Sequence, residues 1–336
     1  MMFEVVPLTR HLQASIINCC KMNMNMDPFD EMSWGTLGTI RPFFNFNAER
    51  DAQDIQAALE QKDAVTLVKI LTNCDNAQRQ IIAQTFKNMK GKELITGLKE
   101  AVSGELADLL SALVMTPLQF EAYRLMQAME GIGTDEEGLL EILCTRSPQQ
   151  LSKISAIYKE DYKKDLEEDL KGETSGHFAK LLVALLKKKV IVGEVQTDTE
   201  VLSEAINKAK ADPGPWITVL TSRDSDHLNQ VFDNLESEKH EAVVEAIEKA
   251  FSGDLKLGLR TLVHCIRKPH LYLAQRLDTK KTAIVQGVMV SHSEEDLLCV
   301  RVAYLKQTGT TLYTALQRQF KGVHLQALLS ICRSED

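Results

Sequence analysis

The chain has 336 residues and a formal net charge of −8, with 44% apolar residues, 6% aromatic residues, 17 Gly and 8 Pro. So few turn-forming and aromatic residues exclude a β-sandwich or a β-barrel, and the apolar fraction is too high for a disordered chain. The acidic charge argues against nonspecific binding to nucleic acid or to an anionic bilayer, because phosphates are neutralised by basic surfaces. An acidic partner therefore requires a bridging cation or a local basic patch.

Residues 1–46 are predicted to be an N-terminal arm outside the repeated part of the chain. Apolar residues at helical spacing between Phe3 and Ile16 indicate a short helix. Two interpretations stay open: a tail that is disordered or packed on the protein's own core, or a helix that binds a protein partner. The arm lacks the basic start of a secretory signal, no apolar run reaches 18 residues, and the seven cysteines lack metal-ligand spacing. We therefore expect a cytoplasmic protein with reduced thiols.

A repeat of about 70 residues follows the arm. A glycine at the entry to an apolar run recurs at Gly104, Gly176, Gly253 and Gly322. An apolar pair before a short polar break recurs with the same spacings of 72, 77 and 69 residues, starting at Ile70. Two independent landmarks with one set of spacings predict four units, at 47–117, 118–189, 190–273 and 274–336.

The second unit shows most clearly that each unit contains about five short helices. A first helix is predicted to start at Pro117, and a second to be capped by Thr134, with Glu137 completing a capping box. A short acidic helix is expected near 166–170, and a fifth helix after Ser175. The predicted fold class is therefore all-α, with four repeats of five helices each.

The segment 129–136 contains the only loop with an identifiable chemical purpose. Gly131 and Gly133 relax the backbone restriction, so that successive peptide carbonyls can turn outward. Outward carbonyls are hard oxygen donors, which suit Ca²⁺. Glu173 precedes a turn that a compact unit would bring beside this loop, and it would supply the carboxylate. The other interpretation is a plain helix-terminating turn, since Gly commonly ends helices.

With these features the sequence resembles the annexin family. The resemblance rests on the four-unit spacing, on Met-Glu-Gly-Ile-Gly-Thr-Asp-Glu at 129–136, on Gly-Glu-Thr-Ser-Gly at 172–176 and on Asn-Ala-Gln-Arg-Gln at 76–80. It implies a curved disc of helices that docks on acidic phospholipid through Ca²⁺ bridges. It also implies a protein that is not an enzyme and that lies peripherally on the cytosolic face of membranes.

The resemblance further implies which residues hold calcium. The principal ligands would be the carbonyls of Met129, Gly131 and Gly133 with the Glu173 carboxylate, and the auxiliary ligands the Thr134 carbonyl and Glu136. The other three units depart from this pattern. The glycine and acid positions fall on Leu59, Gln61 and Ala101 in the first unit and on Lys208, Lys210 and Ala250 in the third. The fourth unit is predicted to lack about three residues around 277–280, and Gln319 takes its acid position.

Lysines stand at or beside the degenerate loops, and they support a second hypothesis. Their ammonium groups would contact lipid phosphate directly where the metal is lost; the candidates are Lys208, Lys210, Lys280 and Lys281, with Lys62 in the first unit. The alternative is that they are ordinary solvated lysines at helix ends. The eight histidines show no paired ligand spacing and no catalytic grouping.

The sequence therefore predicts a non-enzymatic protein that binds acidic phospholipid with Ca²⁺ through one intact site. The alternative function is a helical scaffold that has largely lost its calcium response. Such a scaffold would bind protein partners through its arm or its concave face.

Overall fold

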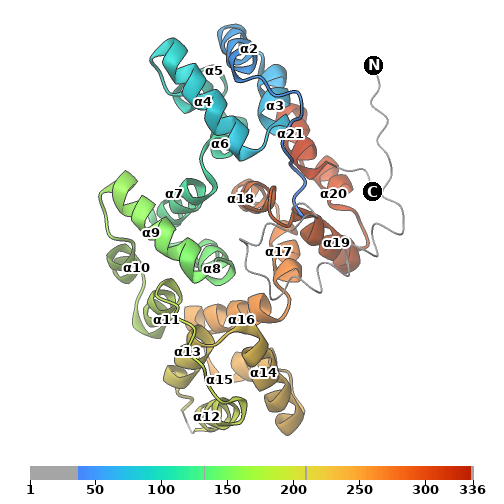
Figure 1. Cartoon of the computed structure of the whole chain (residues 1–336). Helices are drawn as coiled ribbons and strands as arrows, with labels where there is room; N and C mark the ends of the chain where they lie inside the picture. The colour runs from blue at the N-terminus through green and yellow to red at the C-terminus, as the bar shows by residue number, and fades with distance from the viewer. Residues whose placement is uncertain (1–36, 132, 209, 334–336) are drawn as a thin grey trace. The chain divides into compact units, whose positions relative to one another are not determined.

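A computed structural model of the chain describes residues 37–131, 133–208 and 210–333, and within these ranges every regular element is a helix (Figure 1). The helices follow one another in four groups of five, which confirms the all-α class and the four-repeat arrangement. Among the described residues, no helix is both long enough and apolar enough to cross a bilayer. The helix predicted between Phe3 and Ile16, and any partner it binds, lie outside the described residues and stay predictions.

The helices of the four groups have the following bounds. The first group contains α2 (Ala48–Gln61), α3 (Ala64–Asn73), α4 (Asn76–Lys90), α5 (Leu94–Ala101) and α6 (Gly104–Val114). The second contains α7 (Pro117–Met129), α8 (Glu136–Thr145), α9 (Pro148–Tyr162), α10 (Leu166–Glu173) and α11 (Gly176–Leu186). The third contains α12 (Val195–Asn207), α13 (Pro213–Ser222), α14 (Ser225–Lys239), α15 (Val243–Ala250) and α16 (Gly253–Arg267). The fourth contains α17 (Pro269–Leu277), α18 (Thr282–His292), α19 (Leu297–Thr308), α20 (Leu312–Gln319) and α21 (Gly322–Cys332).

The repeated glycines have a common structural role at the start of each fifth helix. Their backbone φ angles lie between 59° and 65°, a left-handed conformation that costs other residues roughly 1–2 kcal/mol; they are Gly104, Gly176, Gly253 and Gly322. The chain therefore turns sharply between the fourth and fifth helices of every group. This turn is the physical reason why a glycine recurs at these positions.

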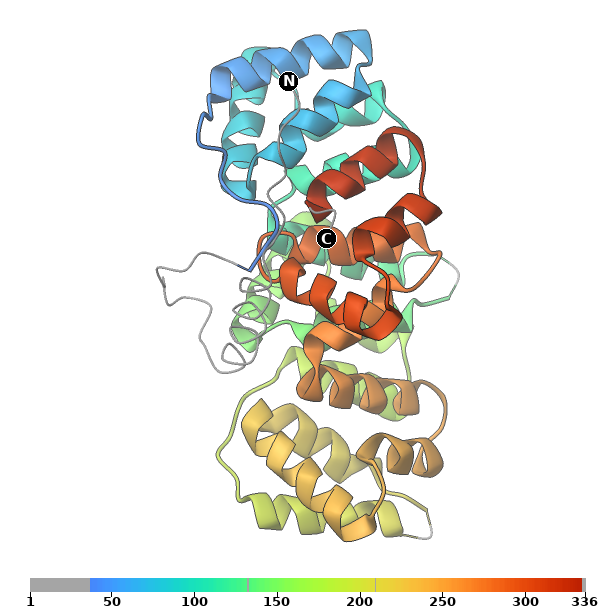
Figure 2. The same cartoon turned by 90° about the vertical axis from the view of Figure 1, so that its right-hand side faces the viewer.

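The first and fourth groups together form one compact unit, which comprises the described residues up to Phe120 and from Leu273 onward. Within it, α2 lies beside α4, and α21 packs against α3 (Figures 1 and 2). The end of the arm is attached to the fourth group, because the Thr39 hydroxyl donates to the Ile331 carbonyl at 2.6 Å. A part-buried ion pair joins the first and fourth groups, with Arg79 Nη2 at 2.6 Å from Glu294 Oε1.

The second and third groups form the other compact unit, residues Glu121–Tyr272. Within it, α8 and α11 pack against α16, and α12 lies beside α14 (Figures 1 and 2). The interior contains leucine-rich faces of these helices together with buried charged groups. Glu121 accepts hydrogen bonds from Arg146 Nε at 3.0 Å and Nη2 at 2.6 Å, and Arg124 bridges Glu121 and Glu141.

The described cysteines agree only in part with the expectation of reduced thiols. Cys74, Cys144, Cys265 and Cys332 are thiols, and all of them except Cys144 are buried. Cys299 is instead disulfide-bonded, so the expectation is wrong at this residue.

Candidate functional site

Residues 130–135 connect α7 to α8, and both glycines of this connection have unusual backbone geometry. Gly131 has φ of 102° and Gly133 has φ of 87°. A Cβ atom built on either residue would meet no heavy atom within 4 Å. The backbone conformation, rather than lack of space, therefore requires glycine at both positions. Ile132 between them lies outside the described residues.

Asp135 fixes both ends of this connection. Its backbone N–H donates to the Ala128 carbonyl at 2.8 Å, and its carboxylate accepts from the Gly138 N–H at 3.1 Å. Asp135 is thus the N-cap of α8. The predicted capping box of Thr134 and Glu137 is wrong, because the N-cap is Asp135 and the capping hydrogen bond is accepted by its carboxylate.

Thr134 instead joins the loop to the end of α10. Its hydroxyl donates to the backbone carbonyl of Glu173 at 3.2 Å, and Glu173 is the last residue of α10. The Glu173 side chain is exposed. The residue that was expected to supply the acid therefore lies beside the glycine loop, although 39 positions separate it from Thr134.

The surroundings of this loop favour a cation. No lysine or arginine lies between 125 and 145, and the carboxylates in and beside the loop are Glu130, Asp135, Glu136 and Glu137. Glu173 adds one more from the end of α10. Glu136 is half-buried at the start of α8, and Met129 is buried at the end of α7. Peptide carbonyls from a turn with two left-handed glycines, together with carboxylates, are the oxygen donors that Ca²⁺ takes. The residues present fit this ion.

Replacing Gly133 by Ala is expected to destabilise the second unit by about 1–2 kcal/mol, because alanine disfavours a φ of 87°. Gly172→Ala is the matched control. Gly172 lies inside α10 with open space around its Cβ position, so alanine there should be neutral or slightly stabilising. Urea unfolding without calcium measures both changes, and equal effects for the two variants would contradict the backbone argument.

The acid position is structurally equivalent in all four groups. The four residues each end the fourth helix of their group, and they are Ala101, Glu173, Ala250 and Gln319. Only the second group therefore presents a carboxylate at this place.

The first group has no corresponding loop. Asp63 donates to the Ala58 carbonyl at 2.8 Å, as Asp135 does to Ala128, but only four residues separate the first pair and six separate the second. Leu59 and Gln61 consequently lie inside α2 rather than in a loop. Lys62 ends the helix with φ of 55°, and its N–H donates to helix carbonyls. The constant repeat spacing of 72 residues aligns Leu59 and Gln61 with Gly131 and Gly133, and therefore does not reveal this difference in loop length.

The third group keeps the length of the loop but changes its charge. Asp212 donates to the Ala205 carbonyl at 3.0 Å, with six residues between them. Lys208 Nζ lies 3.2 Å from Asp212 Oδ2 in an exposed ion pair. The Gly214 N–H and the Lys208 ammonium lower the pKa of Asp212. A cation supplied by the protein thus stands near this loop, and Lys210 is also exposed.

In the fourth group a direct hydrogen bond joins the loop to the acid position. Gln319 Nε2 donates to the Thr279 carbonyl at 2.8 Å. The fourth group is shorter than the second in this region, as predicted. Much of the difference lies in the first helix of the group, since α17 has 9 residues and α7 has 13. Lys280 and Lys281 are exposed, and Lys281 is the N-cap of α18.

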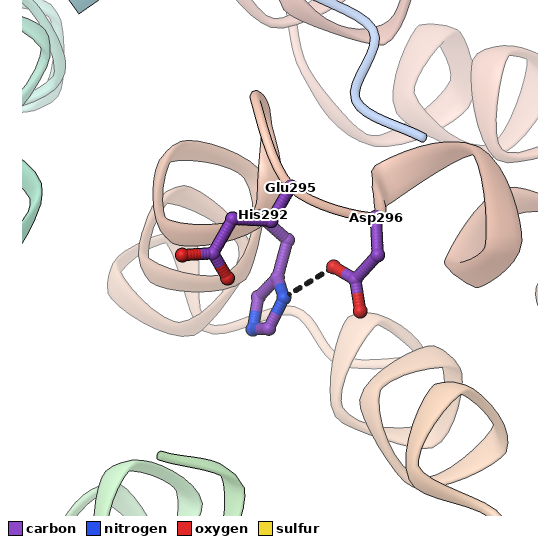
Figure 3. A group of neighbouring side chains, drawn as sticks. All are labelled: His292, Glu295 and Asp296. Carbon is purple, nitrogen blue, oxygen red and sulfur yellow. Dashed lines mark hydrogen bonds and ion pairs between the residues drawn. The ribbon is translucent and has the colours of Figure 1, made fainter. Parts of the chain in front are cut away.

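A different group of possible ligands lies at the end of α18. Ligand atoms of His292, Glu295 and Asp296 lie within 4.8 Å of one another (Figure 3). His292 Nδ1 is 2.7 Å from Asp296 Oδ1, and His292 is buried. The sequence reasoning missed this group, whose only signal is the spacing of three and four residues on one chain segment. The hydrogen bond between His292 and Asp296 is enough to explain their proximity.

Comparison with known proteins agrees with the geometry of the second group. The family model "Annexin" matches residues 50–113, 120–185 and 197–262. Annexin A5 of Gallus gallus is 36% identical over 317 residues, which cover 90% of this chain and 98% of the relative.

Solved structures give the same result. Annexin III superposes with a TM-score of 0.86 at 33% identity, covering 90% of this chain and 98% of that chain. Chicken annexin V in complex with Zn²⁺ superposes with a TM-score of 0.83 at 35% identity, covering 90% and 100%. The chain belongs to the annexin family. Annexins are non-enzymatic membrane-binding proteins.

Proposed function

We propose that this annexin binds acidic phospholipid membranes peripherally, on their cytosolic face, through Ca²⁺ held mainly by the second repeat. Calcium-dependent phospholipid binding is general among annexins, and membership of the family supports it. The observation that carries the proposal for this chain is the hydrogen bond between Thr134 and the Glu173 carbonyl. It supports a single cage formed from the glycine loop and the end of α10.

The ligands proposed for this cage are those implied by the family pattern. The principal ligands are the carbonyls of Met129, Gly131 and Gly133 with the Glu173 carboxylate, and the auxiliary ligands are the Thr134 carbonyl and Glu136. Water or lipid phosphate oxygens would complete the six to eight ligands that Ca²⁺ takes. When bound, the ion would bridge the loop to an anionic headgroup.

The other three groups support a reduced calcium sensitivity. Their acid positions hold Ala101, Ala250 and Gln319, none of which carries a charge. When several weak sites on one surface bind together, the overall affinity for the membrane exceeds that of a single site by roughly 10²–10⁴-fold. A protein with one such site should therefore need far more calcium than a relative with several.

Co-sedimentation with vesicles tests this function. The full chain is mixed with phosphatidylserine or phosphatidylcholine vesicles over a range of calcium concentrations up to millimolar. We expect sedimentation with phosphatidylserine only, rising with calcium and falling in chelator to a low residual level. Failure to bind phosphatidylserine at any calcium concentration would contradict the proposal.

We also propose that lysines beside the degenerate loops contact lipid phosphate without calcium. The residues are Lys208, Lys210, Lys280 and Lys281, all of them exposed. Each is expected to contribute about 1 kcal/mol near an anionic surface. The ion pair with Asp212 reduces the part that Lys208 can play.

Charge reversal at Lys208 and Lys210 tests the lysine proposal. In chelator, the double Lys→Glu variant should bind phosphatidylserine vesicles at least roughly tenfold more weakly than the wild type. Lys159→Glu with Lys163→Glu changes the net charge equally and serves as the control, since both lysines lie at the end of α9 and belong to none of the glycine loops or acid positions. Equal losses in both double variants would show a general charge effect instead.

We further propose the repeat boundaries 47–117, 118–189, 190–273 and 274–336, with one adjustment. Because α17 starts at Pro269, the last boundary fits better after Lys268. Within the family, residues 34–41 and 329–336 support a particular likeness to annexin nine, and residues 45–52 a likeness to annexin two.

A further inference from the structure

In the fourth repeat, a direct hydrogen bond holds the connection between α17 and α18 to the end of α20. Gln319 Nε2 donates to the Thr279 carbonyl at 2.8 Å, and the Lys281 N–H donates to Thr279 Oγ1 at 3.2 Å. Lys281 is the N-cap of α18, as Asp135 is the N-cap of α8. Thr279 therefore stands where the second repeat has Gly133. The Gln319 amide thus binds the carbonyl whose counterpart is proposed above as a calcium ligand.

Cationic side chains flank both ends of this hydrogen bond. Two of them directly follow its acceptor in the sequence, and two stand within two positions of its donor; this cation cluster consists of Lys280, Lys281, Arg318 and Lys321. All four are exposed, and none of their side chains makes an ion pair or a hydrogen bond within the described part of the chain. Asp278 is the only acid in segments 278–281 and 318–321. The hydrogen bond therefore holds together two segments that contain four unpaired cations.

The second repeat has the opposite charge at the equivalent place. Acidic residues surround its glycine loop, and Glu173 occupies the position that corresponds to Gln319. The second repeat is therefore suited to a cation, whereas the fourth is suited to an anion. Cations that lie close together repel one another, so that an anion bound among them is stabilised by all of them.

The anion that suits the cation cluster best is a phosphate monoester on a membrane surface. A monoester carries a charge of about −1.5 to −2 and three acceptor oxygens, so that one group can pair with several cations. Phosphatidylserine, by contrast, has a phosphate diester. All four side chains are exposed to water rather than enclosed, which leaves a free phosphate ion weakly held. A bilayer instead presents many headgroups together, and each cation near an anionic surface adds to the binding.

We propose that the cation cluster is a calcium-independent site for lipid headgroups with a phosphate monoester, and that Gln319 is its positioning residue. This inference rests on the lysine contacts proposed above, and it adds Arg318, Lys321 and a lipid preference to them. Gln319 acts through the Thr279 carbonyl. Its hydrogen bond fixes the connection between α17 and α18 beside the end of α20, so that cations from both segments can meet one headgroup.

Vesicle co-sedimentation of the full chain in chelator tests the lipid preference. Phosphatidylcholine vesicles contain either phosphatidic acid or about twice as much phosphatidylserine, so that both carry a similar charge. The wild type should bind the phosphatidic acid vesicles several-fold more tightly. Equal binding to both would overturn the monoester site but not the proposed calcium-dependent binding. No binding to either would overturn this site together with the lysine contacts on which it rests.

Inorganic phosphate distinguishes a lipid headgroup from a free ion. It should displace the protein from phosphatidic acid vesicles no better than chloride does at the same ionic strength. Displacement by phosphate alone would assign the cation cluster to a soluble anion and overturn its proposed role at membranes.

Removal of one cation from each segment tests the residues of the site. Lys281→Gln combined with Lys321→Gln should weaken binding to phosphatidic acid vesicles at least roughly tenfold. Lys69→Gln combined with Lys90→Gln is the matched control, since both are exposed lysines of the first repeat without an ion pair in the described structure. That control should bind nearly as the wild type does. Equal losses in the two double variants would overturn the assignment to the cation cluster.

Gln319→Leu tests the positioning role, because leucine is similar in size but cannot donate a hydrogen bond. This variant should bind phosphatidic acid vesicles several-fold more weakly and should prefer them less over phosphatidylserine. Urea unfolding should be nearly unchanged, since the Gln319 side chain is exposed. Gln317→Leu changes another exposed glutamine of α20 and should behave as the wild type. Equal binding and equal lipid preference in the two variants would overturn the role of Gln319.

Discussion

Replacement of Glu173 by Gln is expected to raise the calcium concentration for half-maximal binding to phosphatidylserine vesicles by roughly 100-fold or more. The substitution keeps the size of the side chain but removes the charge that would face a divalent ion. Glu173 is exposed and makes its contact with Thr134 through its backbone carbonyl, so the fold should be unchanged. Vesicle co-sedimentation over a calcium series measures the effect.

Glu168→Gln is the matched control for this experiment. Glu168 lies on the same helix, its side chain is 70% exposed, and it makes a surface ion pair with Lys171. Such pairs contribute little, so this variant should bind as the wild type does. Binding of Glu173→Gln that equals that of Glu168→Gln at every calcium concentration would show that Glu173 does not hold the ion.

The second large effect is expected at the buried charges of the second unit. Glu121→Ala should lower the free energy of unfolding by about 3–5 kcal/mol, because it leaves the Arg146 guanidinium without its buried carboxylate. The side chains of Glu121 and Arg146 are only 4% and 6% exposed, and their closest atoms are 2.6 Å apart. Urea unfolding followed by circular dichroism measures the loss.

Two further variants identify the cause of that loss. Glu160→Ala removes an exposed carboxylate of the same repeat and should cost less than about 0.5 kcal/mol. Glu121→Leu combined with Arg146→Met replaces both charges by apolar groups and should recover much of the stability. A cost below about 1 kcal/mol for Glu121→Ala, or no recovery in the double variant, would contradict a strong buried pair.

The fold was predictable because its landmarks are local requirements of the backbone. Gly176 and its three counterparts recur because each fifth helix starts from a left-handed residue. Glu173 could be placed beside the glycine loop for the same reason, since the repeat spacing puts it at the end of a fourth helix.

Features that depend on contacts between distant residues were not predictable. The hydrogen bond from Gln319 to the Thr279 carbonyl and the buried ion pair of Glu121 with Arg146 require tertiary packing. The loop of the first repeat was misjudged for a simpler reason. The residue types at Leu59 and Gln61 suit a helix as well as a loop, so the sequence does not show that α2 continues over them. The hydrogen bond from Asp63 to Ala58 shows that the connection is two residues shorter than in the second repeat.

Crystals of the protein grown with calcium test the central claim most directly, through an anomalous difference map. We predict a peak between the carbonyl oxygens of Met129, Gly131 and Gly133 and the carboxylate of Glu173. That peak should be stronger than any peak beside Ala101, Ala250 or Gln319. A map without density at the second repeat, or with its main peak at His292, would contradict the account.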